Sequence, residues 1–156
     1  VERAVALQTH PGWLGDVWRR LNRKRTVLLA LLVHDLGKGF VGDHSEIGAG
    51  IARDVAARLG LNEDESRELQ FLVRHHLVMS HLSQRRDIHD DKLVVEFART
   101  VGSPEALKRL YLLTYADMRA TGPKVSSNTS SLLRMMAGIV LRSSRRLSSR
   151  SASQRS

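Results

Sequence analysis

The sequence predicts an all-α protein, and three observations support this prediction. Apolar residues recur at intervals of three and four along most of the 156-residue chain. Residues typical of helix starts stand before several of these stretches. The chain is 42% hydrophobic but only 4% aromatic, which suits packed helices better than a β-sandwich. Because the length is that of one domain, we expect one helical domain over residues 1–125 and a Ser/Arg-rich, disordered tail over 126–156.

The first two expected helices differ in character. Residues 13–21 carry an amphipathic stripe and follow the helix-breaking pair Pro11-Gly12. Residues 26–36 are apolar at nearly every position, a pattern that alone fits a buried strand or a buried helix. Because the neighbouring segments are helical, we expect a helix here as well, and it ends with His34 beside Asp35.

A third helix is expected to begin within a polar stretch. Asp43, followed by Glu46 three positions later, resembles a capping box. Apolar residues then recur at helical spacing from Ile47 to Leu59, and Gly60 is a typical stop signal. The sequence thus predicts a helix that starts next to His44.

The remaining helices each bring a polar residue towards the core. Asn62 precedes an acidic first turn and a helix that reaches Leu77, with His75 and His76 near its end. A polar turn around residues 85–90 separates it from a short helix over 93–101. Pro104 then opens a long helix, which Gly122-Pro123 terminates. Asp117 falls on the apolar face of that helix.

Composition excludes several classes of protein. The absence of cysteine rules out disulfides and thiolate metal sites, so any metal ion needs nitrogen and oxygen ligands. The longest apolar run, residues 27–33, is far shorter than the roughly 20 residues that span a bilayer. The N-terminus lacks the layout of a signal peptide. We therefore expect a soluble, cytoplasmic protein with no membrane partner.

The net charge of +9 is concentrated near the C-terminus. Six arginines follow residue 130 with no acidic residue among them, which leaves +3 for the rest of the chain. Such a tail binds polyanions non-specifically by counterion release, but it has no aromatic residue for base stacking. We do not expect a nucleic-acid function beyond such contacts.

A set of imidazoles and carboxylates carries the candidate chemistry. A buried, unpaired carboxylate is costly unless it forms a salt bridge, takes up a proton or binds a metal ion. Mixed imidazole and carboxylate ligands suit Mn²⁺, Fe²⁺, Zn²⁺ or Ni²⁺, and two such ions would favour phosphoester hydrolysis. The expected metal ligands are His34, Asp35, His44, His75, His76 and Asp117.

Plainer interpretations of these residues stay open. Lys38, which we expect to contact a substrate phosphate, could be a solvated loop cation. His44 could be only a first-turn residue, and His76 a hydrogen-bonded core histidine. Three other histidines stand in turn-like contexts, and we expect them at the surface: His10, His81 and His89.

Two motifs carry a resemblance to a known family. "VHDLGKG" and the later "ADMRA" resemble the HD superfamily of metal-dependent phosphohydrolases, which implies an all-α HD-domain helical bundle. "RHHLVMS" and "YADMRATGP" are similar to the HD domain of the bifunctional uridylyltransferase/uridylyl-removing enzymes, over about residues 27–125. This resemblance implies hydrolysis of the phosphodiester that joins UMP to a tyrosine of the PII nitrogen-signalling protein, with Mn²⁺ or Mg²⁺.

The resemblance also implies roles for individual residues. His34, Asp35 and Asp117 correspond to metal ligands, and Lys38 with Asp35 to the catalytic pair. The second metal ion would take His44, His75 and His76.

The chain departs from the family pattern near its N-terminus. That pattern begins with a histidine on an earlier helix, whereas residues 1–9 contain none and His10 lies beyond the expected helix. Two alternatives therefore stand beside the uridylyl-removing enzyme: a stand-alone HD phosphohydrolase acting on a nucleotide phosphoester, and an inactive HD binding module.

Overall fold

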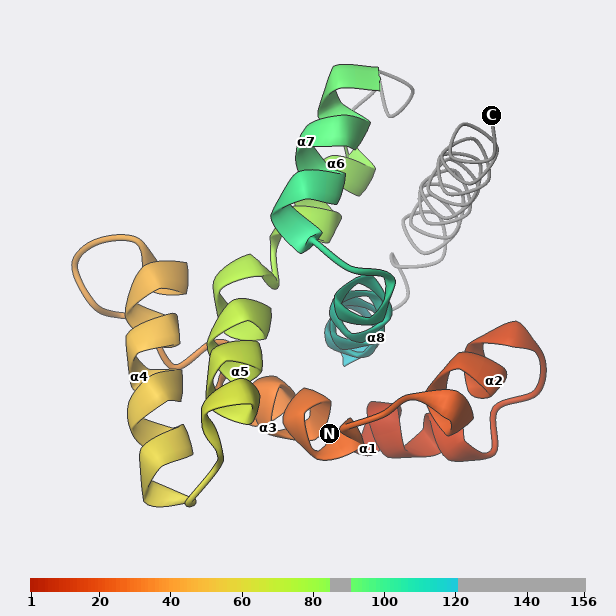
Figure 1. Ribbon diagram of the computed structural model, residues 1–156, viewed down its shortest axis with the longest axis horizontal. Coiled ribbons are helices and arrows are strands. Elements are labelled where there is room, and N and C mark those ends of the chain that lie inside the picture. Colours follow the sequence, from red (N-terminus) through yellow and green to blue (C-terminus); the bar gives the residue numbers. More distant parts are fainter. Residues whose placement is uncertain (85–90, 121–156) are drawn as a thin grey trace, which may run out of the picture.

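The computed structural model describes residues 1–84 and 91–120 (Figure 1), and within them every regular element is a helix. The all-α prediction is therefore confirmed. The elements in chain order are α1 (Glu2–Val5), the 3₁₀ helix η1 (Ala6–Gln8), α2 (Trp13–Arg20), α3 (Lys24–Val33), α4 (His44–Arg58), α5 (Glu63–His75), α6 (Val78–Gln84), α7 (Asp91–Val101) and α8 (Pro104–Ala120).

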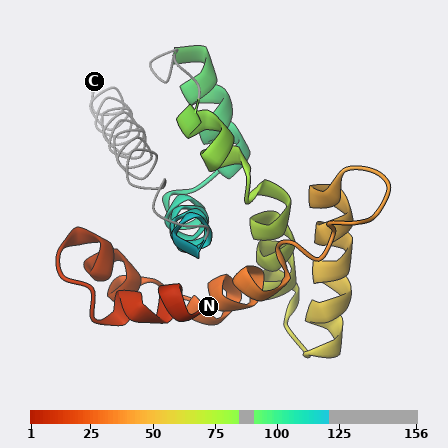
Figure 2. The same ribbon diagram turned by 180° about the vertical axis from the view of Figure 1, so that it is seen from behind.

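Helix α8 is the centre of the arrangement. It packs against α1, α3, α5, α6 and α7, while α4 lies at one edge of the molecule and α2 at the opposite edge in both views (Figures 1 and 2). Residues on several sides of α8 are buried, among them Leu110, Tyr111, Leu112 and Leu113. A polar residue near the end of this helix is thus held among other helices.

Helix α4 packs closely on α5 because its contact face is made of small residues. Gly48, Ala49, Ala52 and Ala56 are all buried there. A Cβ on Gly48 would lie 3.1 Å from the Val73 side chain of α5, so a larger residue would push the two helices apart. This close packing brings the start of α4 next to the end of α5.

The predicted caps are largely confirmed. The Asp43 carboxylate accepts hydrogen bonds from the backbone amides of Ser45 and Glu46, at 2.8 and 3.4 Å. The Glu46 side chain instead pairs with Arg74 of α5, at 2.9 Å, so it links two helices rather than completing a capping box. The complete capping box is at α5, between Asn62 and Glu65.

Other boundaries differ slightly from the sequence prediction. Helix α5 ends at His75 rather than at residue 77, and α6, a separate helix, was not predicted. The apolar segment is helical, as expected, but α3 ends at Val33, and His34 forms its C-cap. The polar turn at 85–90, the Gly122-Pro123 stop and the tail at 126–156 lie outside the described residues. No described helix combines the length and apolarity needed to cross a bilayer.

Candidate active site

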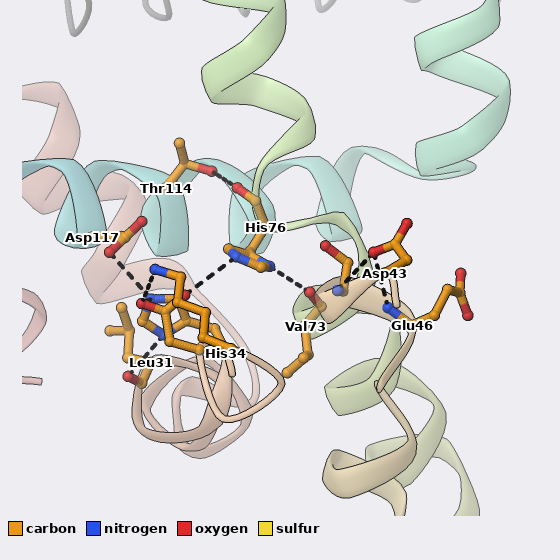
Figure 3. Close-up of polar contacts among 11 residues, drawn as sticks. Leu31, His34, Asp43, Glu46, Val73, His76, Thr114 and Asp117 are labelled. Carbon is orange, nitrogen blue, oxygen red and sulfur yellow. Dashed lines mark hydrogen bonds and ion pairs between the residues drawn. The ribbon is translucent and has the colours of Figure 1, made fainter. Parts of the chain in front are cut away.

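Four side chains from three helices converge beside α8 (Figure 3). The first turn after α3 supplies His34 and Asp35, the end of α5 supplies His76, and the last turn of α8 supplies Asp117. His34 Nε2 lies 3.2 Å from Asp117 Oδ1 and 3.4 Å from Asp35 Oδ2. His76 Nε2 lies 3.7 Å from Asp35 Oδ1, and the two imidazole rings are 5.2 Å apart. We call these four residues the imidazole–carboxylate cluster.

Backbone carbonyls fix the orientation of both imidazoles. His34 Nδ1 lies 3.1 Å from the carbonyl oxygen of Leu31, and His76 Nδ1 lies 2.6 Å from that of Val73. A carbonyl oxygen only accepts hydrogen bonds, so Nδ1 is the donor in each pair. In the neutral form of either ring, the lone pair is therefore on Nε2.

Both Nε2 atoms then face carboxylate oxygens. His76 Nε2 is buried and has no hydrogen-bond partner among the described residues, and its nearest charged neighbour is Asp35. His34 Nε2 faces Asp35 and Asp117 together. A neutral imidazole lone pair opposite a carboxylate is unfavourable unless a proton or a cation lies between them. This arrangement is suited to binding a cation.

The pKa values follow from the same geometry. Burial acts to lower the pKa of His34, but the hydrogen bond to Asp117 and the charges of Asp117 and Asp35 raise it above its usual value. The hydrogen bond with His34 lowers the pKa of Asp117. Burial lowers the pKa of His76. Near neutral pH, Asp117 is thus ionised and His76 is neutral, as metal ligands must be.

The loop after α3 brings His44 to the same place. A Cβ on Gly37 would lie only 2.0 Å from the backbone oxygen of His44, so only glycine allows the loop to pass this close to α4. The His44 ring lies 5.7 Å from the His76 ring. Its Nε2 atom is buried and has no hydrogen-bond partner in the described part of the chain, which makes it a second nitrogen available to a ligand.

Lys38 lies at the exposed side of the cluster. Its Nζ is 2.7 Å from Asp35 Oδ2, and its side chain is 59% exposed. It is thus not simply a solvated loop cation, since it is paired with a residue of the cluster. An exposed pair of this kind contributes little to stability, so the ammonium can exchange this contact for a phosphate at small cost.

The remaining histidines lie elsewhere. The His75 ring packs on Phe71, with ring centroids 4.7 Å apart, and burial lowers its pKa. No ring contact or ion pair joins it to the cluster among the described residues, so its role as a ligand stays a prediction. His10 bonds locally to the Pro11 carbonyl, at 2.7 Å. His81 is exposed, as expected, and residue 89 is outside the described ranges.

The donor set fits a divalent cation chemically. Imidazole nitrogens and carboxylate oxygens are ligands of Mn²⁺, Fe²⁺ and Zn²⁺, and two buried Nε2 atoms lack a protein partner. The side chains contact one another rather than surrounding one point, and in the described ranges no three His, Asp or Glu residues are arranged as a finished metal centre. The residues present fit the group, while the coordination itself is a matter for proposal.

Some residues that support the site carried no sequence signal. The carbonyls of Leu31 and Val73 orient the two imidazoles, but any residue type offers a carbonyl. Glu68 of α5 is an almost buried carboxylate paired with two arginines of other elements. Its position on a helix face predicts burial, but the pattern along the chain does not name its partners.

Comparisons with known proteins agree with this geometry. The HD domain family matches residues 7–115. The bifunctional uridylyltransferase/uridylyl-removing enzyme of Gluconobacter oxydans is 48% identical over 105 residues, which are 67% of this chain and 11% of that enzyme. The enzyme of the same description from Vibrio vulnificus is 47% identical over 110 residues, or 70% of this chain and 13% of the relative.

A third relative extends the similarity further along the chain. The bifunctional uridylyltransferase/uridylyl-removing enzyme of Azospirillum brasilense is 42% identical over 118 residues, 76% of this chain and 13% of the relative. The chain thus spans only about an eighth of the length of these relatives. The family match covers most of the described residues and all four members of the imidazole–carboxylate cluster except Asp117, which lies two positions beyond it. The resemblance noted in the sequence is confirmed, and the chain belongs to the HD domain family.

Proposed function

We propose that this chain is a metal-dependent phosphodiester hydrolase of the uridylyl-removing type, which acts in the cytoplasm and releases UMP from a uridylylated PII protein in nitrogen regulation. Membership of the HD family and similarity to the uridylyl-removing enzymes support a metal-dependent phosphohydrolase. The observation that carries the proposal is the pair of Nε2 atoms, on His34 and His76, that face carboxylates while their Nδ1 atoms are bound to backbone carbonyls.

Two groups of residues would hold metal ions. His34, Asp35 and Asp117 would bind one ion, since their Nε2 and carboxylate oxygens already face one another. His76 and His44 would bind a second, because both Nε2 atoms are buried and available. We retain His75 as a possible third ligand of that ion. Mn²⁺ or Mg²⁺ is the metal that the family resemblance implies.

The chain's own residues would prepare the reaction. A bound divalent ion would act as a Lewis acid on the substrate phosphate. Lys38 would leave Asp35 and place its ammonium against a phosphate oxygen, which offsets negative charge that develops during displacement. Water would attack phosphorus, the bond from phosphorus to the tyrosine oxygen would break, and the tyrosine would regain a proton. The buried walls around His76 would exclude bulk water from its side of the site.

The proposal is tested by UMP release from uridylylated PII in the presence of Mn²⁺. We expect release by the wild-type chain and none by Asp35→Asn. Asp54→Asn is a matched control, because Asp54 is an exposed aspartate of α4 that pairs only with its neighbour Arg53. This control should behave as the wild type.

Other results would point to the two alternatives. Turnover of free nucleotide phosphoesters without release from PII would contradict the proposed substrate and indicate a stand-alone nucleotide phosphohydrolase. Saturable Mn²⁺ binding without any hydrolysis would contradict the proposed activity and indicate a binding module.

A further inference from the structure

A second charged cluster lies on the same three helices as the candidate site. The Glu68 side chain of α5 is only 10% exposed and lies between two arginines. Its Oε1 is 2.7 Å from Nε of Arg109 on α8, whose side chain is 12% exposed. Its Oε2 is 3.2 Å from Nη1 of Arg23, the residue that precedes α3. We call these three residues the ion cluster.

Each member of the ion cluster precedes a site residue on the same element. Glu68 stands eight positions before His76, and Arg109 stands eight positions before Asp117. Arg23 is the N-cap of α3, and His34 is its C-cap. Eight helical residues span about 12 Å. Because a helix is stiff over that length, a shift at the ion cluster is carried to the site residue at the other position.

The backbone at Arg23 supports this interpretation. Arg23 has φ of 57°, and it is the only non-glycine residue with a positive φ in the described ranges. This left-handed conformation is disfavoured for residues with a Cβ, and it persists only where surrounding contacts hold it. Glu68 holds the guanidinium, and Arg109 donates a hydrogen bond from Nε to the backbone oxygen of Asn22, at 3.4 Å. The start of α3 is thereby tied to both α5 and α8.

The exposed ion pairs of α5 differ in this respect. Arg67 pairs with Glu63 and Asp64 within its own helix, and all three side chains are more than half exposed. Such pairs place no constraint on another helix. A nearly buried ion pair is a weak source of stability compared with apolar packing, but its bonds have direction. Direction is what the relative placement of three helices needs.

We infer that Glu68 is a positioning residue: by binding Arg23 and Arg109, it fixes α3, α5 and α8 relative to one another and so sets the spacing of His34, His76 and Asp117. It touches none of these site residues itself. In its metal-binding readout the inference rests on the proposed function, whereas the placement of the two imidazoles can be measured without a metal ion.

The test compares Glu68→Gln with Glu63→Gln, the same change at an exposed position of the same helix. Calorimetric titration with Mn²⁺ should show binding roughly tenfold weaker for Glu68→Gln, at the lower end of what changes outside the ligand set cost, with the helical circular dichroism unchanged. Glu63→Gln should bind as the wild type. Equal affinities in all three proteins would overturn the inference.

A second variant covers the case in which Glu68→Gln does not fold. Arg23→Gln removes the more exposed partner, whose side chain is 41% exposed, and leaves the pair between Glu68 and Arg109 in place. It should weaken Mn²⁺ binding by about threefold, a fraction of the outer-shell range. Unchanged affinity in this folded variant would contradict a positioning role.

A wild-type chain that binds no Mn²⁺ would overturn the proposed function rather than this inference. Long-range ¹H–¹⁵N spectra of the imidazole rings in the metal-free protein then decide the matter. Glu68→Gln, or Arg23→Gln if the former is unfolded, should shift the His34 and His76 signals, and Glu63→Gln should not. Identical imidazole signals in the folded variant and the wild type would refute the role of Glu68.

Discussion

The ion cluster and the imidazole–carboxylate cluster arise from the same three elements but satisfy their charges differently. In the ion cluster, each carboxylate oxygen of Glu68 meets a guanidinium, at 2.7 and 3.2 Å. In the imidazole–carboxylate cluster, acceptors face acceptors: Asp35 is opposite the Nε2 atoms of His34 and His76.

This difference distinguishes a cluster that holds the fold from one that binds a ligand. A fully paired set of buried charges is closed, because nothing further can be added to it. A set with buried lone pairs and no partner is tolerated only where a ligand completes it. Changes to the first cluster should therefore reduce stability, and changes to the second should mainly reduce ligand binding.

The largest effect on stability is expected from opening the ion cluster. Arg109→Leu leaves the nearly buried Glu68 with only Arg23, and removing one partner of such a pair costs about 3 kcal/mol of the free energy of unfolding. Urea denaturation measures the loss. Arg53→Leu is the control, because its pair with Asp54 is exposed. A loss below about 0.5 kcal/mol for Arg109→Leu, the size of an exposed pair, would show that the ion cluster does not hold the fold.

A somewhat smaller effect is expected where the loop meets α4. Gly37→Ala places a Cβ 2.0 Å from the backbone oxygen of His44, which forces the loop away and costs about 2 kcal/mol, as overpacking does. Gly50→Ala is the control, because a Cβ there meets nothing within 4 Å. It should stabilise α4 by roughly 0.5–1 kcal/mol. Denaturation curves in which both variants match the wild type would contradict the close approach.

The two histidines of the cluster should give opposite pH dependences in chelator-treated protein. The pKa of His34 is raised, so the stability it contributes is present below its usual value and is lost as pH rises through the folded-state pKa. The pKa of His76 is lowered, so it disfavours folding at acidic pH, where the unfolded chain takes up the proton.

Urea denaturation at about pH 5.5 and about pH 8.5 measures both effects. The stability advantage of wild type over His34→Gln should shrink as pH rises, while that over His76→Gln should grow. Parallel changes in the two comparisons would show that the environments of these rings are not as different as the structure indicates.

The smallest effect is expected on the exposed face of α5. Arg67→Ala removes the pairs with Glu63 and Asp64, which are largely solvent-exposed, and should cost no more than about 0.5 kcal/mol. Thermal denaturation provides the measurement. A loss as large as that of Arg109→Leu would remove the distinction between cross-helix and within-helix ion pairs.

Much of the fold could be predicted because helix signals are local. Caps at Asp43 and Asn62 mark helix starts from the identity of one or two residues, and both were confirmed. The apolar face of α8 pointed Asp117 inwards before its partners were known. Helix α6 was missed because it follows α5 after only two residues, with no glycine or proline to separate them.

The candidate site could be predicted only in part. The sequence brought His34, Asp35, His76 and Asp117 together as chemical types, and the structure places them in contact. It could not assign the proton to Nδ1 of either imidazole, because that depends on backbone carbonyls, nor could it pair Glu68 with arginines far away in the chain.

The neighbouring histidines show the same limit of sequence prediction. His75 and His76 differ by one position, yet His76 joins the cluster while the ring of His75 packs on Phe71. Adjacent positions on a helix point about 100° apart, so the tertiary arrangement decides which of the two reaches the site.

The central claim is that the imidazole–carboxylate cluster binds a divalent metal ion. Calorimetric titration of the full chain with Mn²⁺, beside Asp35→Asn, tests it most directly, because Asp35 faces both imidazoles and the Asn variant keeps the shape of the side chain. We expect saturable binding by the wild type and a loss of affinity of more than about 100-fold in the variant, beyond the range of changes outside the ligand set. Equal binding by both proteins, or no binding by the wild type, would contradict the claim.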